Sequence, residues 1–239
     1  MQDFPSTRPS AILATASDDP LVRRDAWERI VSAYWKPVYK YLRLRWRQTP
    51  EAAEELTQAF FTFAMEKEFL ARFDAERASF RTYLRTCLDA FVANEFKAAG
   101  RQKRGGGATM LSLDFASAEF EAGRQEWRED MSPEEYFHRE WQRQVFALAV
   151  EDLRDWAERQ GKAAALRCFE MYDLAEERRT YDEIGAAVGV PATTVTNHLH
   201  AMRRQLRVLV ARRIDALTVT EQESRQEAQR LLGGGGATS

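Results

Sequence analysis

The stretch TYDEIGAAVGVPATTVTNHLHAMRRQLRVLV, residues 180–210, decides the fold of the C-terminal part of the chain. Thr180 and Glu183 have the spacing of a capping box, which predicts that a short helix begins there. The Gly-Val-Pro sequence at 189–191 ends that helix and turns the chain, and a long amphipathic helix follows. This succession predicts a helix-turn-helix that binds double-stranded DNA through the major groove.

The long helix has one apolar and one polar side. Apolar side chains from Val195 to Leu209 recur along one line at about 100° per residue, so we expect this side in the core. The opposite arc carries the residue types that hydrogen-bond to base edges and phosphates. A solvated basic helix is the alternative, and a steep salt dependence of DNA affinity would exclude it. The candidate duplex contacts are Thr193, Thr196, Asn197, His200, Arg203, Arg204 and Arg207.

Helical spacing dominates the whole chain and alternating apolar and polar runs are absent, which predicts an all-α protein. We expect two small helical domains joined by a flexible acidic linker. The C-terminal domain should belong to the helix-turn-helix DNA-binding class, similar to a winged helix without the wing. The predicted segments are an N-terminal extension at 1–25, a domain at 26–104, a linker at 105–132, a domain at 133–215 and a frayed tail at 216–239.

The charge of the chain is distributed unevenly. Its net charge is −2, but residues 97–104 and 203–213 each form a basic cluster. Residues 114–140, between the clusters, carry nine acidic residues against three arginines. Two basic clusters separated by an acidic connector favour two separate contacts with nucleic acid.

Composition excludes several classes of protein. There is no run of about 20 apolar residues that could cross a bilayer, and the N-terminus lacks a secretory signal pattern. The two cysteines lie far apart, so we expect no disulfide framework. These features predict a soluble, cytoplasmic protein that makes no contact with a membrane.

The sequence also lacks the signature of an enzyme. It has no carboxylates at metal spacing, no nucleophile beside a base and no phosphate loop after a strand. His198 and His200 lie about 200° apart on their helix and cannot share a metal ion. We therefore predict no catalytic residue, no metal and no cofactor.

The segment EAAEELTQAFFTFAME, residues 51–66, predicts a helix that begins at Thr49-Pro50. Its expected apolar face runs from Ala53 through Leu56, Phe60 and Phe63 to Ala64. Phe61 is expected beside the acidic face, which suggests a partner with a basic and partly apolar surface. The alternative is that another segment of this chain covers Phe61. The candidate partner-binding residues are Glu54, Glu55, Gln58 and Phe61.

In the next segment, residues 68–107, aromatic and basic residues interleave. Bases of single-stranded DNA stack on aromatic rings while cations follow the backbone, so the pattern fits a single-strand platform. The same aromatic residues also fit a hydrophobic core, and the sequence leaves both interpretations open.

Together these motifs resemble an RNA polymerase sigma factor of the extracytoplasmic-function (ECF) type. The resemblance covers residues 27–104 and 133–213, and the strings AAEELTQAFF, FRTYL and YDEIGAAVGVPATTVTNHLHAMRRQL carry it. It implies a subunit that binds core RNA polymerase and directs it to promoter DNA. The helix-turn-helix would bind the minus-thirty-five element. A helix-turn-helix regulator that acts without polymerase is the alternative.

The resemblance also implies roles for the N-terminal half. Residues 52–59 align with an acidic string that docks on the clamp helices of the largest polymerase subunit, although Ala52 and Ala59 replace two family acids. The loop at 73–79 corresponds to the loop that captures a flipped base, and residues 80–104 correspond to the helix that melts the promoter. The candidate contacts with the melted strand are Arg77, Arg81, Tyr83, Asn94, Lys97, Arg101, Lys103 and Arg104.

Two further hypotheses concern regulation and the linker. Thr57, at the expected margin of the acidic face, is a candidate phosphorylation site for a Ser/Thr kinase, because phosphate would replace the missing negative charge. An ordinary role at the helix margin is the alternative. An anti-sigma factor is another candidate partner. The acidic stretch 114–140 either imitates nucleic acid in the RNA exit path or acts as a solvated tether.

Overall fold

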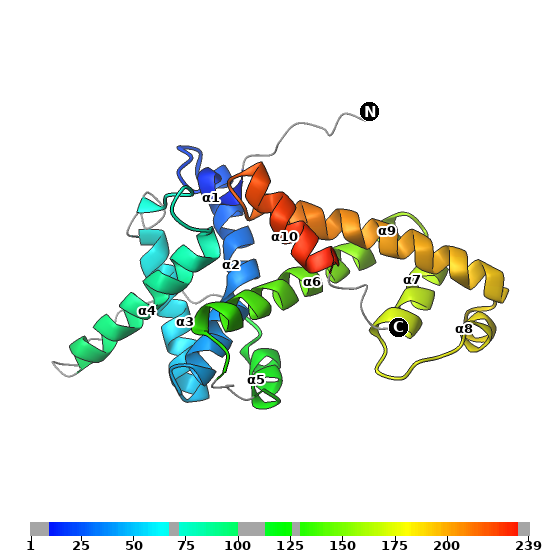
Figure 1. The fold of residues 1–239 in the computed structure, drawn as a ribbon, viewed down its shortest axis with the longest axis horizontal. Helices are drawn as coiled ribbons and strands as arrows, with labels where there is room; N and C mark the ends of the chain where they lie inside the picture. Colours follow the sequence, from blue (N-terminus) through cyan, green and yellow to red (C-terminus); the bar gives the residue numbers. More distant parts are fainter. Residues whose placement is uncertain (1–9, 67–71, 100–112, 126–129, 234–239) are drawn as a thin grey trace. The chain divides into compact units, whose positions relative to one another are not determined.

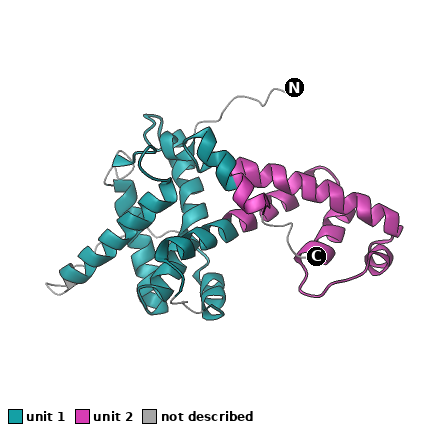
Figure 2. Cartoon of the chain, viewed as in Figure 1, with its two compact units in different colours: residues 1–144, 215–227 teal, residues 145–214, 228–239 magenta. Residues whose placement is uncertain are grey.

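The computed structural model describes residues 10–66, 72–99, 113–125 and 130–233. Within them it contains ten α-helices, a short π-helical segment and no strand, so the all-α prediction is confirmed (Figure 1). Two compact units share the chain, and both are coloured in Figure 2. Unit 1 comprises residues 1–144 and 215–227, and unit 2 comprises residues 145–214 and 228–239.

Unit 1 is built around one long helix. The apolar residues between Ile30 and Leu42 of this helix are buried. The Tyr34 ring stacks on Phe137 and Trp141, and meets Phe80 edge-on at 5.5 Å. The helices that contribute to unit 1 are α1 (Ala11–Ala14), α2 (Pro20–Leu44), α3 (Pro50–Glu66), α4 (Phe80–Ala99), α5 (Phe115–Gly123), the first part of α6 (Pro133–Arg159) and the first part of α10 (Glu221–Gly233).

Side-chain caps mark the starts of two helices, and the first of them confirms the predicted start at Thr49-Pro50. The backbone N–H of Ala52 donates to Thr49 Oγ1 at 3.3 Å, and α3 begins at Pro50, directly after Thr49. The N–H of Glu135 donates to Ser132 Oγ at 3.1 Å, and α6 begins at Pro133. Each cap satisfies a backbone donor that has no partner inside the helix, so these short-range signals fixed both positions.

Unit 2 contains the predicted helix-turn-helix. Both halves of the capping box between Thr180 and Glu183 are present at its start. The turn begins at Gly189, which has a φ of +78° that L side chains rarely adopt. The helices that contribute to unit 2 are the second part of α6, α7 (Ala163–Phe169), the π-helical segment η2 (Glu170–Leu174), α8 (Tyr181–Val188) and α9 (Ala192–Ala216).

At Gly185, helix α8 packs closely against the backbone of the turn at Val190. The N–H groups of Gly189 and Val190 donate to its carbonyl oxygen at 2.8 and 2.9 Å. A Cβ atom at Gly185 would lie 2.6 Å from the carbonyl oxygen of Val190. The turn between the two helices therefore has room only for a glycine at this position.

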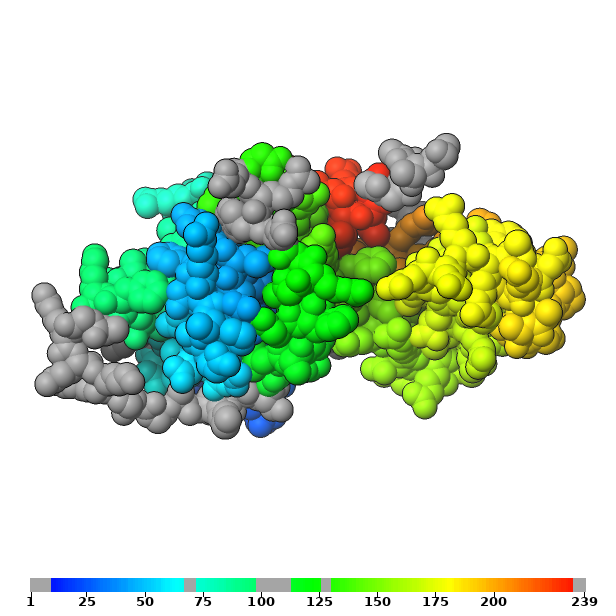
Figure 3. Space-filling model, turned by 90° about the horizontal axis from the view of Figure 1, so that it is seen from below, coloured from blue at the N-terminus to red at the C-terminus, as the bar shows by residue number. Residues whose placement is uncertain are grey.

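The predicted flexible linker is only partly a linker. Residues 105–112 and 126–129 lie outside the described residues, but Phe115–Gly123 forms helix α5, which contacts α2. The Phe115 ring lies 5.5 Å from Trp35 and 5.3 Å from Tyr39. In the space-filling view, the green atoms of α5 lie against the blue atoms of α2 (Figure 3). Aromatic packing orders this part of the acidic stretch.

The prediction of a frayed tail from residue 216 is wrong for most of that segment. Glu221–Gly233 forms helix α10, and Leu217, Thr218 and Glu227 are buried. The unit boundaries also differ from the predicted domains, because unit 1 extends to Gln144 and includes residues 215–227. The polar composition of this segment gave no apolar periodicity that would predict α10, which specific contacts such as Arg81 with Glu227 hold in place.

Candidate nucleic-acid and protein interfaces

Helix α9 buries the side that its sequence predicts. Val195, Leu199 and Met202 are at most 1% exposed, and the apolar seam continues to Leu209. The opposite arc therefore faces away from the core of unit 2. Of the candidate duplex contacts, Thr196 and Arg203 are half-buried, and the exposed ones are Thr193, Asn197, His200, Arg204 and Arg207.

Arg203 differs from the other candidates because its guanidinium group is already engaged. Its Nε and Nη2 donate to the two carboxylate oxygens of Asp173, both at 2.9 Å. The group also lies 5.4 Å above the ring of Tyr172. The hydrogen bonds to Asp173 raise the pKa of Arg203. Arg203 thus links α9 to the π-helical segment, a role that its place in a basic cluster did not predict.

Arg213 has a similar structural role. Its Nε and Nη2 donate to Asp152 at 2.6 and 2.7 Å, which joins α9 to α6 within unit 2. By contrast, Arg204, Arg207 and Arg212 are exposed and form no ion pair with a described residue. The second basic cluster therefore divides into arginines that hold the unit together and arginines that face solvent.

The buried face of α3 is rotated relative to the prediction. Ala53, Phe60 and Ala64 are buried as expected, but Phe63 is 37% exposed and Phe61 is fully buried. The expectation that Phe61 projects from the acidic face is wrong, because its ring packs 5.5 Å from Phe60. The acidic face itself remains, with Glu55 exposed and with Glu54 and Gln58 half-buried.

Thr57 lies in the core rather than at the margin of the acidic face. It is 0% exposed, and its hydroxyl donates to the carbonyl oxygen of Ala53 at 2.7 Å. A kinase needs the hydroxyl to be accessible, so the folded chain withholds Thr57 from phosphorylation. The phosphorylation hypothesis is therefore contradicted for the folded state. The hydroxyl instead satisfies its own hydrogen bond inside a buried helix face.

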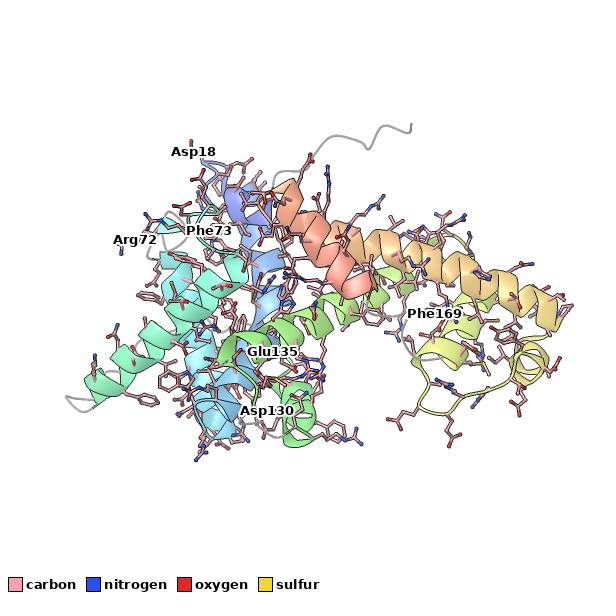
Figure 4. The ribbon with its side chains drawn as sticks, viewed as in Figure 1. Asp18, Arg72, Phe73, Asp130, Glu135 and Phe169 are labelled. Carbon is pink, nitrogen blue, oxygen red and sulfur yellow. The ribbon has the colours of Figure 1, made fainter. Side chains whose placement is uncertain are left out.

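Most of the aromatic residues on α4 and in the loop before it belong to the core. Phe80 and Phe91 are buried, and Phe73 packs 5.4 Å from both Phe80 and Tyr83. Figure 4 labels Phe73 close to the start of α4. Tyr83 is half-buried and its ring is used in this packing. These contacts favour the core interpretation over a platform of stacked bases.

The remaining candidate strand contacts of the same segment fall into three groups. Arg81 is 9% exposed and donates to Glu227 of α10 at 2.7 Å, so it is not available to DNA in this state. Arg77, Asn94 and Lys97 are exposed. The remaining candidates, Arg101, Lys103 and Arg104, lie outside the described residues.

The acidic residues of α5 bind basic residues of α2. Lys40 is 3% exposed and its Nζ lies 2.5 Å from Glu121 and 2.9 Å from Glu140. Glu119 accepts hydrogen bonds from Arg43 at 2.6 and 2.7 Å, and these lower its pKa. In this part of the acidic stretch, Glu119 and Glu121 form ion pairs with cations of their own chain.

The described residues contain no group of three or more histidine, cysteine or acidic side chains placed to hold a metal ion. Cys87 and Cys168 are free thiols, and burial raises the pKa of both. None of the described helices combines the length and the apolar character that a membrane span requires.

A helix-turn-helix with an outward basic arc, in a chain that also carries a helical unit with an acidic face, has the features of a DNA-binding protein. The family model described as ECF sigma factor matches residues 23–212, and the chain belongs to that family. No curated protein and no solved structure gives a significant match. The chain is thus a sigma subunit that binds core RNA polymerase and directs it to promoter DNA, and it is not an enzyme. The alternative of a regulator that acts without polymerase falls away.

Proposed function

We propose that unit 2 binds the minus-thirty-five promoter element through the exposed arc of α9. The observation that carries the proposal is that Arg204 and Arg207 face solvent beside Asn197, on a helix whose other side is buried. Exposed arginines neutralise phosphates and pair with guanine, and asparagine pairs with adenine. Arg203 would act as a positioning residue, since Asp173 already holds its guanidinium group.

The acidic face of α3 would dock on the clamp helices of the largest polymerase subunit. Glu54, Glu55 and Gln58 form this face, while Phe61 supports it from inside the core. Carboxylates on a rigid helix suit a basic partner surface, because attraction between the opposite charges accelerates binding and orients the partners. The core polymerase would be met in the cytoplasm, and an anti-sigma factor remains a further predicted partner.

The exposed residues of α4 and of the loop before it would contact the separated promoter strand. Arg77, Asn94 and Lys97 are exposed along this segment. The basic residues that follow, Arg101, Lys103 and Arg104, would extend the contact. Because most rings of this segment are packed inside unit 1, we expect phosphate contacts to contribute more than base stacking.

A charge-reversal experiment tests the docking face. The variant Glu54→Lys/Glu55→Lys should bind purified core polymerase at least tenfold more weakly, because it replaces attraction with repulsion. Its promoter-dependent run-off transcription should fall accordingly. The matched control is Glu151→Lys/Asp155→Lys, which makes the same charge change at two exposed acids of α6. Equal loss of core binding in both variants would reject the assignment of α3, and no run-off product with the unmodified protein would reject the proposed function itself.

A further inference from the structure

Helix α10 lies beyond residues 23–212, the part of the chain that the family model matches, and yet it contributes to unit 1. Leu217 and Thr218, which precede it, are 3% and 5% exposed, and Glu227 is 2% exposed. Burial of a carboxylate without a cation is strongly unfavourable. A buried glutamate in a polar terminal helix therefore indicates a specific docking site.

The docking site of Glu227 lies between α4 and α6. Its Oε1 accepts a hydrogen bond from Arg81 Nη2 at 2.7 Å, and its Oε2 lies 3.9 Å from His138 Nε2. The guanidinium group of Arg81 also lies 5.2 Å above the Trp141 ring. The charge pair is thus enclosed by aromatic residues of unit 1.

Glu223, one turn earlier on α10, reaches the first residue of α4. Burial raises its pKa, while a hydrogen bond from the backbone N–H of Val219 at 3.4 Å, the charge of Arg81 and the nearby backbone N–H of Phe80 act in the opposite direction. Residues four apart share one face of a helix, so both carboxylates point toward the start of α4. The N-terminal end of a helix favours anions, which adds to the attraction of Arg81.

Arg81 is not fully satisfied by this contact. Its Nε is buried and has no hydrogen-bond partner. A guanidinium group offers five N–H donors in a planar fork that fits the oxygens of a phosphate group. The start of α4 therefore has the donors of an anion site, and Glu227 fills it incompletely.

We propose that α10 is an internal clasp that occupies a phosphate-binding site for single-stranded DNA, formed by Arg81 and the backbone N–H of Phe80. The inference rests on the proposed contact between α4 and the separated promoter strand. Carboxylates of α10 stand where the strand brings phosphates, so clasp and strand exclude each other. The free protein keeps the clasp closed, and capture of the strand requires α10 to leave.

The test uses the full-length protein without polymerase and a fluorescein-labelled single-stranded DNA of mixed sequence. The variant Glu227→Gln keeps the side-chain shape and removes the charge that pairs with Arg81. If the clasp is closed in about nine molecules of ten, this variant binds the DNA about tenfold more tightly in fluorescence anisotropy. The matched control is Glu221→Gln, which makes the same charge change at an exposed position of α10 and should bind as the unmodified protein does.

Three further measurements make the outcome decisive. Arg81→Ala added to the glutamine variant should abolish the gain, and amide hydrogen exchange over 221–233 should rise in the glutamine variant but not in the control. A chain ending at Thr220, which retains Leu217 and Thr218, should reproduce the gain if the glutamine variant does not fold. Equal affinities of the glutamine variant and its control, or a gain that survives Arg81→Ala, would overturn the clasp. Run-off transcription separates the two proposals: transcription without the gain removes the clasp alone, and the gain without transcription removes the promoter function alone.

Discussion

Helices α4 and α9 both carry arginines in the segments that the sequence predicts to contact DNA. They differ in how many of these arginines form ion pairs with acids of the same chain. On α4, Arg81 pairs with Glu227, and Arg85 pairs with Glu134 and Asp89. On α9, Arg204 and Arg207 remain exposed without an ion pair among the described residues. The comparison teaches that the position of acids elsewhere in the chain decides whether an arginine is available to a phosphate. Acidic segments at 114–140 and 221–227 perform this neutralisation in unit 1.

The largest expected effect comes from removing Lys40, the buried cation that Glu121 and Glu140 share in unit 1. Lys40→Ala leaves Glu140, whose side chain is 1% exposed, and Glu121 without their shared cation. Both acids keep a second partner, Arg143 and Lys36 respectively. We therefore expect a loss of about 3 kcal/mol in the free energy of unfolding, at the low end for a broken buried pair. Urea denaturation followed by circular dichroism measures it.

The matched control for this substitution is an ion pair that the core does not enclose. Arg24→Ala removes the exposed pair of Arg24 with Glu28, whose side chains are 71% and 67% exposed. Such a pair contributes at most about 1 kcal/mol, so the free energy of unfolding should hardly change. If both substitutions cost the same, burial is not what distinguishes the network around Lys40.

The second prediction compares two arginines of α9. Arg207→Ala should leave stability unchanged and reduce the slope of log affinity against log salt for a mixed-sequence duplex by about 1, because one phosphate contact is lost. Arg203→Ala should instead lower the thermal stability of unit 2, because it breaks the bidentate contact with Asp173. It should leave the slope of log affinity against log salt nearly unchanged. Fluorescence anisotropy at several salt concentrations and thermal denaturation distinguish them. Equal reductions of the slope would show that Arg203 also binds the duplex.

The sequence predicted the parts of the fold that depend on neighbouring residues. The caps at Thr49, Ser132 and Thr180 act over three residues, so they could be identified without the rest of the chain. The buried side of α9 followed from a regular apolar spacing. Membership of the sigma family rested on the same local strings.

The failures of prediction concern contacts over long distances in the chain. On α3, apolar residues flank both sides of the core line, so periodicity alone could not decide between Phe61 and Phe63 for burial. Helix α5 lies in a stretch rich in acids and α10 has a polar sequence, and partners more than 75 residues away hold both helices. A pattern along one helix does not contain the position of such a partner. The orientation of Arg81 was missed for the same reason.

The smallest predicted effect is a difference between α5 and α10 in how the stability of their docking depends on pH. Hydrogen bonds from Arg43 lower the pKa of Glu119, and those from Lys36 and Lys40 outweigh the effect of burial to lower that of Glu121. Their contribution to the docking of α5 is complete above the unfolded pKa of about 4.3 and is lost as pH falls below it. Burial raises the pKa of Glu223, so the sign for α10 is reversed. Its contribution is complete below the unfolded pKa and is lost as pH rises through the folded pKa.

Acidification from neutral pH to below about pH 4 should therefore loosen α5, while the titration of Glu223 leaves α10 as well protected or better. Amide hydrogen exchange of peptides covering 113–125 and 215–233, corrected for the intrinsic pH dependence of exchange, measures the two segments in one sample. The shift should be modest, because Glu119 and Glu121 are partly exposed and solvent screens their ion pairs. Parallel loosening of both segments would mean that loss of carboxylate charge dominates at α10 as well. Opposite responses would show that the two acidic segments, although both dock on basic residues, are held by different balances of burial and charge.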